Sequence, residues 1–417
     1  MASHNTMRIV KELRDFERNP EAQFQLSYNE DDLTVMHALI TGPPETPYAY
    51  GLFNFKLVFP TGYPIEPPKA DLTTTNQNRT RFNPNLYAGG KVCLSILGTW
   101  RGEPGEMWNH AHGIQSVLIS IQSLMGENPF TNEPGFDKIK PEHAGLAVLY
   151  KRKIAHETIR VTICDVIEKG FTGDNFDVAF QDTSKYLFMC YYQNYLQTIK
   201  TEMPLVTKGK RFERMPFEGS GNTMDGSFDY EDLTTRLNAI KDRINAETEA
   251  WVAASQSSEW LDPDLLIFHN LMGQFRQITA SGTFDDSMEL QLAKENSPYV
   301  WTATLFGKPE TNYEGGFFQV RLVFHKDFPK HRARIQFITP FYHPEVSSTG
   351  YFFYHSVPRM DDVTSHLQIL LRLLTEPPRG NPTGHCNPDA AKLHFGTPEQ
   401  KREYARNVRR CASRSVE

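Results

Sequence analysis

The chain has 417 residues, too many for one hydrophobic core, so its length predicts two or three domains. Charged residues make up 23% and hydrophobic residues 39%, a composition typical of soluble globular proteins. The formal net charge of −6 does not indicate a nucleic-acid partner, and no apolar run approaches the roughly 20 residues that span a bilayer.

The cysteines do not indicate a disulfide framework or a structural zinc site, because they are odd in number, widely spaced and lack a Cys-x-x-Cys motif. They are Cys93, Cys164, Cys190, Cys386 and Cys411. The pair His110 and His112 has no third ligand nearby, so we expect no metal and no cofactor. Charged residues at the N-terminus argue against a secretory signal, which predicts an intracellular protein, in the cytoplasm and also the nucleus.

The first half of the chain begins with an amphipathic helix predicted at residues 7–18. Four strand-like runs follow, separated by proline and glycine turns. These runs lie at residues 24–28, 35–41, 53–59 and 69–74. Helical patterns resume near Ile114, so the order of elements predicts an α+β fold with a four-stranded antiparallel meander and flanking helices.

An internal repeat relates the two halves of the sequence. Eleven residues of the first half recur 265 positions later with their spacing unchanged, and further matches follow at offsets of 260 and 249. The eleven are Gly42, Pro44, Glu45, Thr46, Tyr48, Gly51, Phe53, Leu57, Val58, Phe59 and Pro64, with counterparts from Gly307 to Pro329. The chain is therefore predicted to hold two copies of one fold.

Between the copies, residues 141–169 and 176–200 have helical patterns rich in aromatic residues, and a loop at 201–226 precedes another helical pattern from Tyr230. We therefore predict three parts joined in tandem. They are a first domain at 1–170, a helical extension and linker at 171–261, and a second domain at 262–417.

The chemistry is concentrated around Cys93, which follows the pair Gly89-Gly90 and lies eight residues after Asn85. A sulfur nucleophile that carries an acyl group releases it through a tetrahedral oxyanion, which requires positioned hydrogen-bond donors. Asn85 is a candidate donor, and an alternative role is to hold the loop by bonding its backbone.

Several motifs resemble the ubiquitin-conjugating enzymes. They are Tyr63-Pro64-Ile65-Glu66-Pro67-Pro68, Asn83-Pro84-Asn85 and Cys93-Leu94. That family usually has histidine where this chain has Asn83, which puts the stabilisation of the loop in question. Stretches near 93–100, 127–136, 156–160 and 228–230 are similar to the subfamily called ubiquitin-conjugating enzyme Z, as far as about residue 247.

This resemblance implies that Cys93 accepts ubiquitin or a ubiquitin-like modifier as a thioester from an activating enzyme, and transfers it to a lysine or a ligase cysteine. Asn85 then stabilises the oxyanion or the loop, and Glu133 lies near the incoming lysine of a protein substrate. The resemblance also implies two partner-binding surfaces. Arg8 and Lys11 on the first helix meet the activating enzyme, whereas Ile65 and the segment with Trp108 meet a ubiquitin ligase.

The second copy has lost these groups. Its triplet is His343-Pro344-Glu345, and Phe353 stands at the position of Cys93. A phenyl ring carries no acyl group, and a carboxylate in place of the amide repels an oxyanion. We therefore predict that residues 262–417 form an inactive ubiquitin-conjugating-like domain.

Two other functions remain open. A noncatalytic ubiquitin-binding scaffold of two such domains is disfavoured by the spacing of Asn85 and Cys93, and a cysteine hydrolase is disfavoured because no Cys/His signature is visible.

Overall fold

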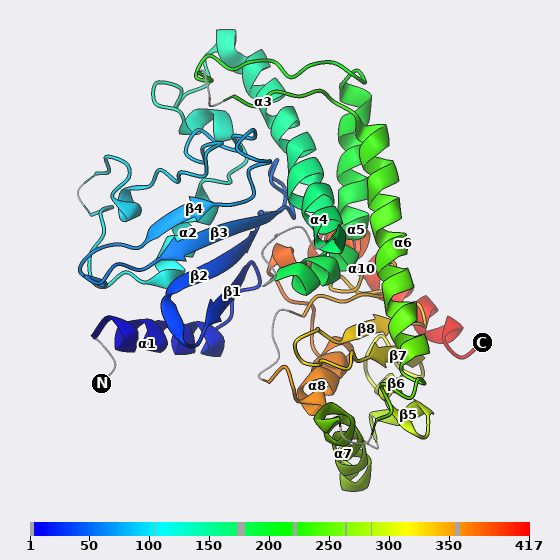
Figure 1. Ribbon diagram of the computed structural model, residues 1–417. Coiled ribbons are helices and arrows are strands. Elements are labelled where there is room, and N and C mark those ends of the chain that lie inside the picture. The colour runs from blue at the N-terminus through cyan, green and yellow to red at the C-terminus, as the bar shows by residue number, and fades with distance from the viewer. Residues whose placement is uncertain are drawn as a thin grey trace. The chain divides into compact units, whose positions relative to one another are not determined.

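The computed structural model describes residues 4–417 except 104, 173–179, 220–222, 263–264, 285 and 355–358. The chain forms two compact units (Figure 1). One comprises Met1–Gln181 and Tyr195–Leu237, and the other comprises Asp182–Asn194 and Asn238–Glu417. Within the described residues, no helix has the length and apolar character that crossing a membrane requires.

The first unit is built on a four-stranded antiparallel sheet of order β1-β2-β3-β4. Its strands are β1 (Phe24–Asn29), β2 (Asp32–Thr41), β3 (Leu52–Val58) and β4 (Lys69–Leu72). The sheet is preceded by α1 (His4–Arg18) and followed by α2 (Ile114–Ser123), and apolar residues of both helices are buried with the sheet in one core. The predicted α+β plan with an antiparallel meander is confirmed.

A helical segment completes the first unit after the sheet. Its parts are α3 (Ala144–Glu157), a π-helix (Thr158–Asp165) and α4 (Val166–Thr172). The π-helix is hydrogen-bonded to the start of β3, where Thr162 Oγ1 accepts the backbone N–H of Leu52 at 3.1 Å. His156, at the end of α3, accepts the backbone N–H of Asp229 at 3.0 Å through Nε2. The two stretches that resemble enzyme Z, 156–160 and 228–230, therefore meet within this unit.

The second unit repeats the sheet. Its strands are β5 (Met288–Lys294), β6 (Ser297–Phe306), β7 (Phe317–Val323) and β8 (Arg334–Phe337), in the order β5-β6-β7-β8. Its helices include α7 (Leu266–Ser281), α8 (Val363–Thr375), α9 (Pro388–Phe395) and α10 (Pro398–Arg414). The register repeats as well, since Val35 pairs with Val58, and Val300 pairs with Val323. All four residues of these pairs obey the predicted offset of 265.

One turn explains why a glycine recurs in both copies. A Cβ on Gly42 would lie 1.9 Å from the carbonyl oxygen of Tyr48, and one on Gly307 would lie 1.7 Å from that of Tyr313. Any side chain would therefore break the turn between the second and third strands of either sheet.

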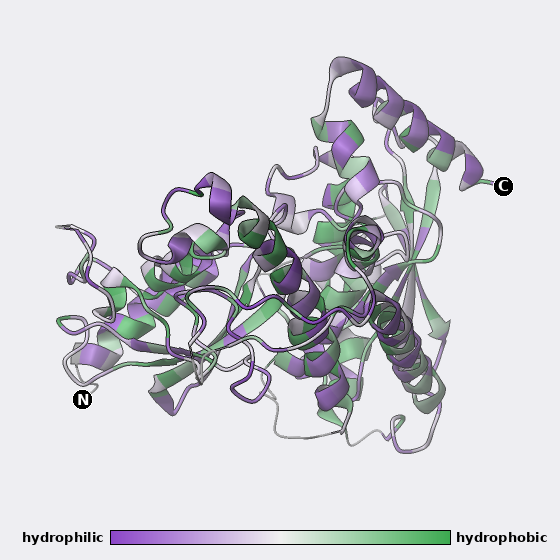
Figure 2. Cartoon of the chain, turned by 90° about the horizontal axis from the view of Figure 1, so that it is seen from above, coloured by the Kyte–Doolittle hydropathy of each residue, from purple (hydrophilic) through white to green (hydrophobic). Residues whose placement is uncertain are grey.

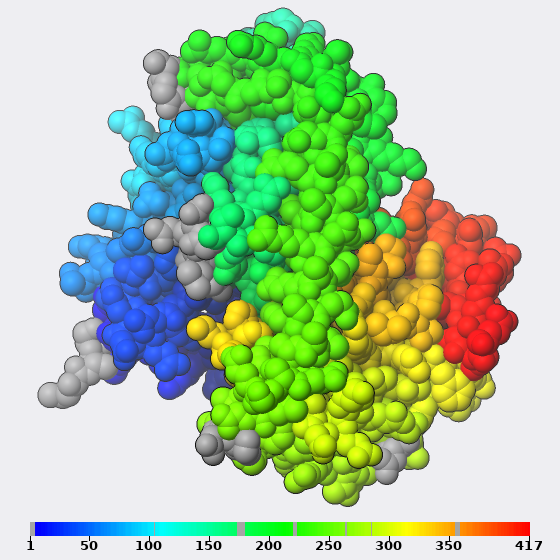
Figure 3. Space-filling model, turned by 45° about the vertical axis from the view of Figure 1, so that its right-hand side comes forward, coloured from blue at the N-terminus to red at the C-terminus, as the bar shows by residue number. Residues whose placement is uncertain are grey.

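The last helix, α10, begins with a capping box. Gln400 donates its backbone N–H to Thr397 Oγ1 at 3.4 Å, and Thr397 donates its own to Gln400 Oε1 at 2.8 Å. Figure 2 shows much of this helix in the purple of hydrophilic residues, and Figure 3 shows its residues, in red, on the surface. Tyr404, Val408 and Ala412 are nevertheless buried, so α10 is a packed amphipathic helix.

Two long helices, α5 (Gln181–Glu202) and α6 (Tyr230–Ala254), contribute to both units. Within the second unit, Tyr186 of α5 donates its hydroxyl hydrogen to Phe352 O at 3.1 Å, and Tyr191 donates to Thr383 O at 2.8 Å. The first residues of the predicted helix 176–200 lie outside the described residues. The boundaries 1–170, 171–261 and 262–417 remain predictions, although residues 182–194 and 238–261 pack with the second unit.

A buried ion pair in the first unit allows a prediction about stability. Lys153 Nζ lies 2.5 Å from Glu218 Oε1, and both side chains are only 1% exposed. Burial lowers the pKa of Lys153, opposed by Glu218. We expect Lys153→Met to lower the free energy of unfolding of this unit by about 3–5 kcal/mol, because an unpaired buried carboxylate remains. Denaturant unfolding measures this.

The matched control is Lys151→Met, which removes the exposed pair of Lys151 and Glu127, 3.2 Å apart. Its loss is expected to be below about 1 kcal/mol. The double change Lys153→Met with Glu218→Leu should recover most of the stability, since no buried charge is left. Equal effects of the two single changes would contradict the assigned role of the buried pair.

Candidate active site

The loop that carries Cys93 is fixed to the edge of the first sheet by its backbone. Leu72 of β4 donates its N–H to the carbonyl of Gly90 at 2.7 Å. Gly90 has a φ of +93°, and a Cβ there would lie 2.7 Å from the carbonyl oxygen of Leu72. Glycine is required for this conformation and this close approach. Gly90 therefore fixes where the loop turns back toward Cys93.

Asn85 and Cys93 are joined by reciprocal hydrogen bonds. The Cys93 N–H donates to Asn85 O at 2.9 Å, and Asn85 Nδ2 donates to Cys93 O, also at 2.9 Å. The loop-stabilising role considered from the sequence is thus present. The amide has a second N–H, which makes no hydrogen bond among the described residues. Asn85 therefore holds the loop and retains one donor beside Cys93.

The thiol of Cys93 lies in a mixed environment. The residue is 2% exposed, and burial raises the pKa of the thiol. The positive charges of Lys91 and Arg81 and a hydrogen bond from Tyr87 act in the opposite direction on this pKa. The loop thus supplies groups that favour the thiolate, the reactive form of cysteine, against the effect of burial.

Asn83 performs the structural task that the sequence left in question. Its Oδ1 accepts the backbone N–H of Asn85 at 2.9 Å, and its Nδ2 donates to Leu124 O at 2.8 Å. In the second copy, His343 Nδ1 accepts the backbone N–H of Glu345 at 3.0 Å. An asparagine amide and an imidazole therefore make the same loop-closing bond in the two copies.

Arg81 is a site residue that sequence reasoning missed. Its side chain is 4% exposed, and its guanidinium donates to Pro84 O at 2.7 Å and lies 4.7 Å from the ring centre of Tyr87. It also approaches Glu133 to 3.5 Å. Burial raises the pKa of Glu133, opposed by Arg81. Arg81 thus links the predicted acidic residue Glu133 to the loop of Cys93. In the sequence, the signal for its role is its position two residues before the Asn83-Pro84-Asn85 triplet.

The predicted partner-binding residues lie together. Arg8, Lys11 and Ile65 line one surface groove of about 640 Å³ between α1 and residues 61–65, and Ile65 is 83% exposed. Trp108 is partly buried beside it, where its Nε1 donates to Pro64 O at 2.9 Å. The structure therefore brings together the residues predicted to meet an activating enzyme and a ligase. Binding by either partner remains a prediction.

The second copy retains the backbone hydrogen bond of the loop but lacks the cysteine and the asparagine side chains. Phe353 donates its N–H to Glu345 O at 2.8 Å, as Cys93 does to Asn85 O. Phe353 is 1% exposed, with its ring 6.0 Å from that of Tyr191. The carboxylate of Glu345 is fully buried and pairs with Arg372 at 2.5 Å. This pairing compensates the charge of Glu345, which weakens the predicted repulsion of an oxyanion. The inactivity of the second copy stays a prediction, and the buried phenyl ring of Phe353 supports it.

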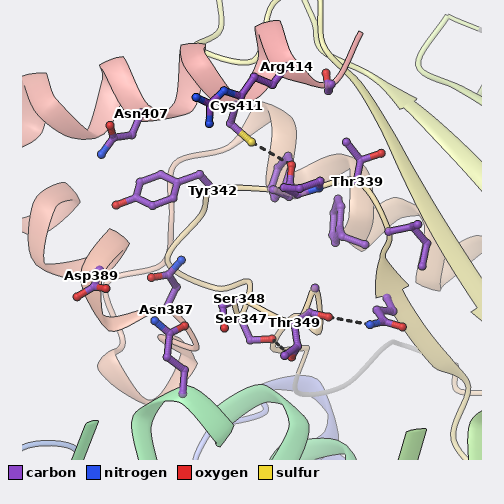
Figure 4. Close-up of a pocket in the computed structure, with 18 of the residues that line it drawn as sticks. Thr339, Tyr342, Ser347, Ser348, Thr349, Asn387, Asp389, Asn407, Cys411 and Arg414 are labelled. Atoms are coloured by element: carbon purple, nitrogen blue, oxygen red, sulfur yellow. Dashed lines mark hydrogen bonds between the residues drawn. The ribbon is translucent and has the colours of Figure 1, made fainter. Parts of the chain in front are cut away.

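Cys411 is the one cysteine of the five that is not buried, and it lines a cavity of about 910 Å³ in the second unit (Figure 4). The cavity is bordered by α10 and residues 338–342 and 347–350. The thiol donates to Pro340 O at 2.9 Å, and burial raises its pKa. This thiol has no amide partner of the kind that Asn85 gives Cys93.

The fold and the cysteine-bearing loop are those of a transferase. The family model described as "Ubiquitin-conjugating enzyme" matches residues 8–157 and 275–412, which cover most of both units' sheets and helices. The chain therefore belongs to the ubiquitin-conjugating enzyme family.

Curated relatives agree with this assignment and confirm the resemblance to enzyme Z. Ubiquitin-conjugating enzyme E2 Z of Danio rerio is 42% identical over 238 residues, which are 57% of this chain and 68% of that protein. The dual E2 ubiquitin-conjugating enzyme/E3 ubiquitin-protein ligase BIRC6 of Homo sapiens is 49% identical over 119 residues, 28% of this chain and 2% of that protein. A solved structure of human ubiquitin-conjugating enzyme E2 G1 is 31% identical, covers 30% of this chain and 97% of its own, and has a TM-score of 0.27.

Proposed function

We propose that Cys93 accepts ubiquitin, or a ubiquitin-like modifier, as a thioester from an activating enzyme and transfers it to a lysine or to a ligase cysteine. In the first step, the Cys93 thiolate attacks the thioester carbonyl on the activating enzyme, and that enzyme's thiolate leaves. In the second, a lysine amine attacks the new thioester, loses a proton, and the Cys93 thiolate leaves. The reciprocal bonds of Asn85 and Cys93 carry this proposal.

Three groups support the second step. The free N–H of Asn85 donates to the oxyanion, Tyr87 bonds the sulfur that must leave as thiolate, and Glu133 accepts or orients the proton of the incoming amine. Burial raises the pKa of Glu133, which makes its carboxylate a better proton acceptor. A noncatalytic scaffold would account for the loop-holding bonds of Asn85, but not for its free N–H or for the groups at Cys93 that favour the thiolate.

The test is loading of the full chain with purified ubiquitin and ATP, using two different ubiquitin-activating enzymes in parallel. A band that is heavier by one ubiquitin on a non-reducing gel, and that thiol reagents remove, is the expected result. The two reactions also show which activating enzyme is the partner. Failure to load with either enzyme, or an adduct that resists thiol, would contradict the proposal.

The second copy is proposed to be inactive as a conjugating domain, so Phe353→Cys should not create a second loading site. The position is buried and covered by Tyr191 of α5. In a Cys93→Ala background, the added Phe353→Cys change is expected to give no adduct with an activating enzyme and ubiquitin. Cys93→Ala alone is the control, and a thiol-sensitive adduct only in the double variant would show that the second copy keeps latent activity.

A further inference from the structure

A cluster of side chains that can bind a metal ion lies on the loop between β7 and β8, far in sequence from Cys93. His325, Asp327 and His331 each offer a ligand atom, and these atoms all lie within 4.8 Å of one another. The two imidazole rings are 4.3 Å apart between centres, and His325 Nδ1 lies 3.7 Å from a carboxylate oxygen of Asp327. The sequence alone predicts no metal, since the pair His110 and His112 lacks a third ligand nearby.

The surroundings hold the imidazoles in place. The ring of His325 lies against Trp251 and Trp260, with ring centres at 4.8 and 5.1 Å. Asp182 Oδ1 is 3.9 Å from His331 Nδ1. Carboxylates in this position orient histidines that bind metals through the other nitrogen.

Asp182 is itself firmly placed. Arg334 lies 2.6 Å from its Oδ1, and the backbone N–H of Arg332 donates to its Oδ2 at 2.7 Å. An outer carboxylate that is already paired does not need His331 to compensate its charge. Among the described residues, Nε2 of His331 makes no hydrogen bond, so this nitrogen is open to a metal ion.

The first copy makes the same connection without any of these groups. At the offset of 265, its residues are Pro60, Gly62 and Glu66. Joining the third and fourth strands of this sheet thus requires no imidazole. The two histidines and the aspartate are a local feature of the second copy, and their convergence calls for a separate explanation.

We propose that His325, Asp327 and His331 bind one Zn²⁺ ion through two imidazole nitrogens and one carboxylate oxygen, with water in the fourth position. Two nitrogen ligands and one oxygen suit Zn²⁺, whereas a single carboxylate is too few for the oxygen-rich sites of Mg²⁺ or Ca²⁺. The ligand atoms must close to about 3.3 Å for tetrahedral bonding. Asp327 is exposed and free to rotate.

One bond changes on binding. His325 Nδ1 now accepts the backbone N–H of Asp327 at 3.1 Å, and it would exchange this bond for the metal. The ion would clamp residues 325–331 as a closed loop on the second unit. This role does not depend on the proposed transfer reaction at Cys93.

The experiment is zinc titration of the metal-stripped full chain against a chromogenic chelator. We expect one Zn²⁺ per chain, and a higher melting temperature with Zn²⁺ than with Mg²⁺. His331→Ala and Asp327→Asn should each weaken binding at least about tenfold, the low end of the cost of losing even an outer-shell partner. His269→Ala, an exposed histidine on α7, is the matched control and should bind as the unmodified chain does.

Asp327→Asn preserves shape at an exposed position, so it keeps the test decisive if His331→Ala fails to fold. Equal zinc affinity in the unmodified chain and in Asp327→Asn would overturn the site. Tighter binding of Fe²⁺ than of Zn²⁺ under anaerobic conditions would overturn the assignment of the metal, because two histidines and one carboxylate also suit iron.

Discussion

Cys93→Ala is expected to form no thiol-sensitive adduct with ubiquitin, a complete loss in the loading reaction. Three of the remaining cysteines, Cys164, Cys190 and Cys386, are fully buried. Cys411 is partly exposed, but burial raises the pKa of its thiol and it donates to a backbone carbonyl. Cys93 is itself only 2% exposed, and what distinguishes it is its pairing with Asn85 and the presence of Lys91, Arg81 and Tyr87, which favour its thiolate.

Two further variants complete this test on non-reducing gels. Cys93→Ser should accumulate an adduct that resists thiol, because an oxygen ester replaces the thioester. Cys411→Ser should load as the unmodified chain does, since its cavity lies in the second unit. An adduct that persists in Cys93→Ala and disappears when Cys411→Ser is added would move the nucleophile to Cys411.

Asn85→Ala is expected to slow transfer from charged Cys93 to lysine by about 10²–10³-fold, the usual cost of one oxyanion donor. Loading should change much less, because the activating enzyme contributes its own site to that step. The measurement is a single-turnover chase, in which charged enzyme is separated and mixed with free lysine. Loading and discharge are timed separately.

Asn83→Ala is the matched control for loop collapse. Asn83 is fully buried, and its bonds to the Asn85 backbone and Leu124 hold the loop without reaching Cys93. This variant should slow loading and discharge together. If Asn85→Ala also slows both steps equally, its function is to hold the loop, and the oxyanion role is wrong.

The strands and their repeat could be predicted because they leave local signals. Period-two runs bounded by glycine and proline marked β1 to β4, and an unchanged offset revealed the register that the second sheet repeats. The capping box of α10 is equally local, four residues with complementary side chains.

The supporting residues of the site could not be predicted because their roles depend on burial and long-range packing. Arg81 is recognisable as a site residue only from the contacts of its guanidinium with Tyr87 and Glu133 in the folded chain. Glu345 looked like a repulsive charge until Arg372, from α8, was found beside it. The grouping of His325, Asp327 and His331 also depends on the folding of a loop, because these residues are not next to one another in the sequence.

The contacts of α5 in the second unit have a consequence for synthesis on the ribosome. The hydroxyl groups of Tyr186 and Tyr191 donate to backbone carbonyls that are synthesised 166 and 192 residues later. At the roughly 5–20 residues per second of translation, this delay is on the order of 10–40 s. During that interval a helix with several aromatic side chains is exposed without its final partners. Nascent-chain handling by chaperones should therefore be most important between the emergence of α5 and that of α9.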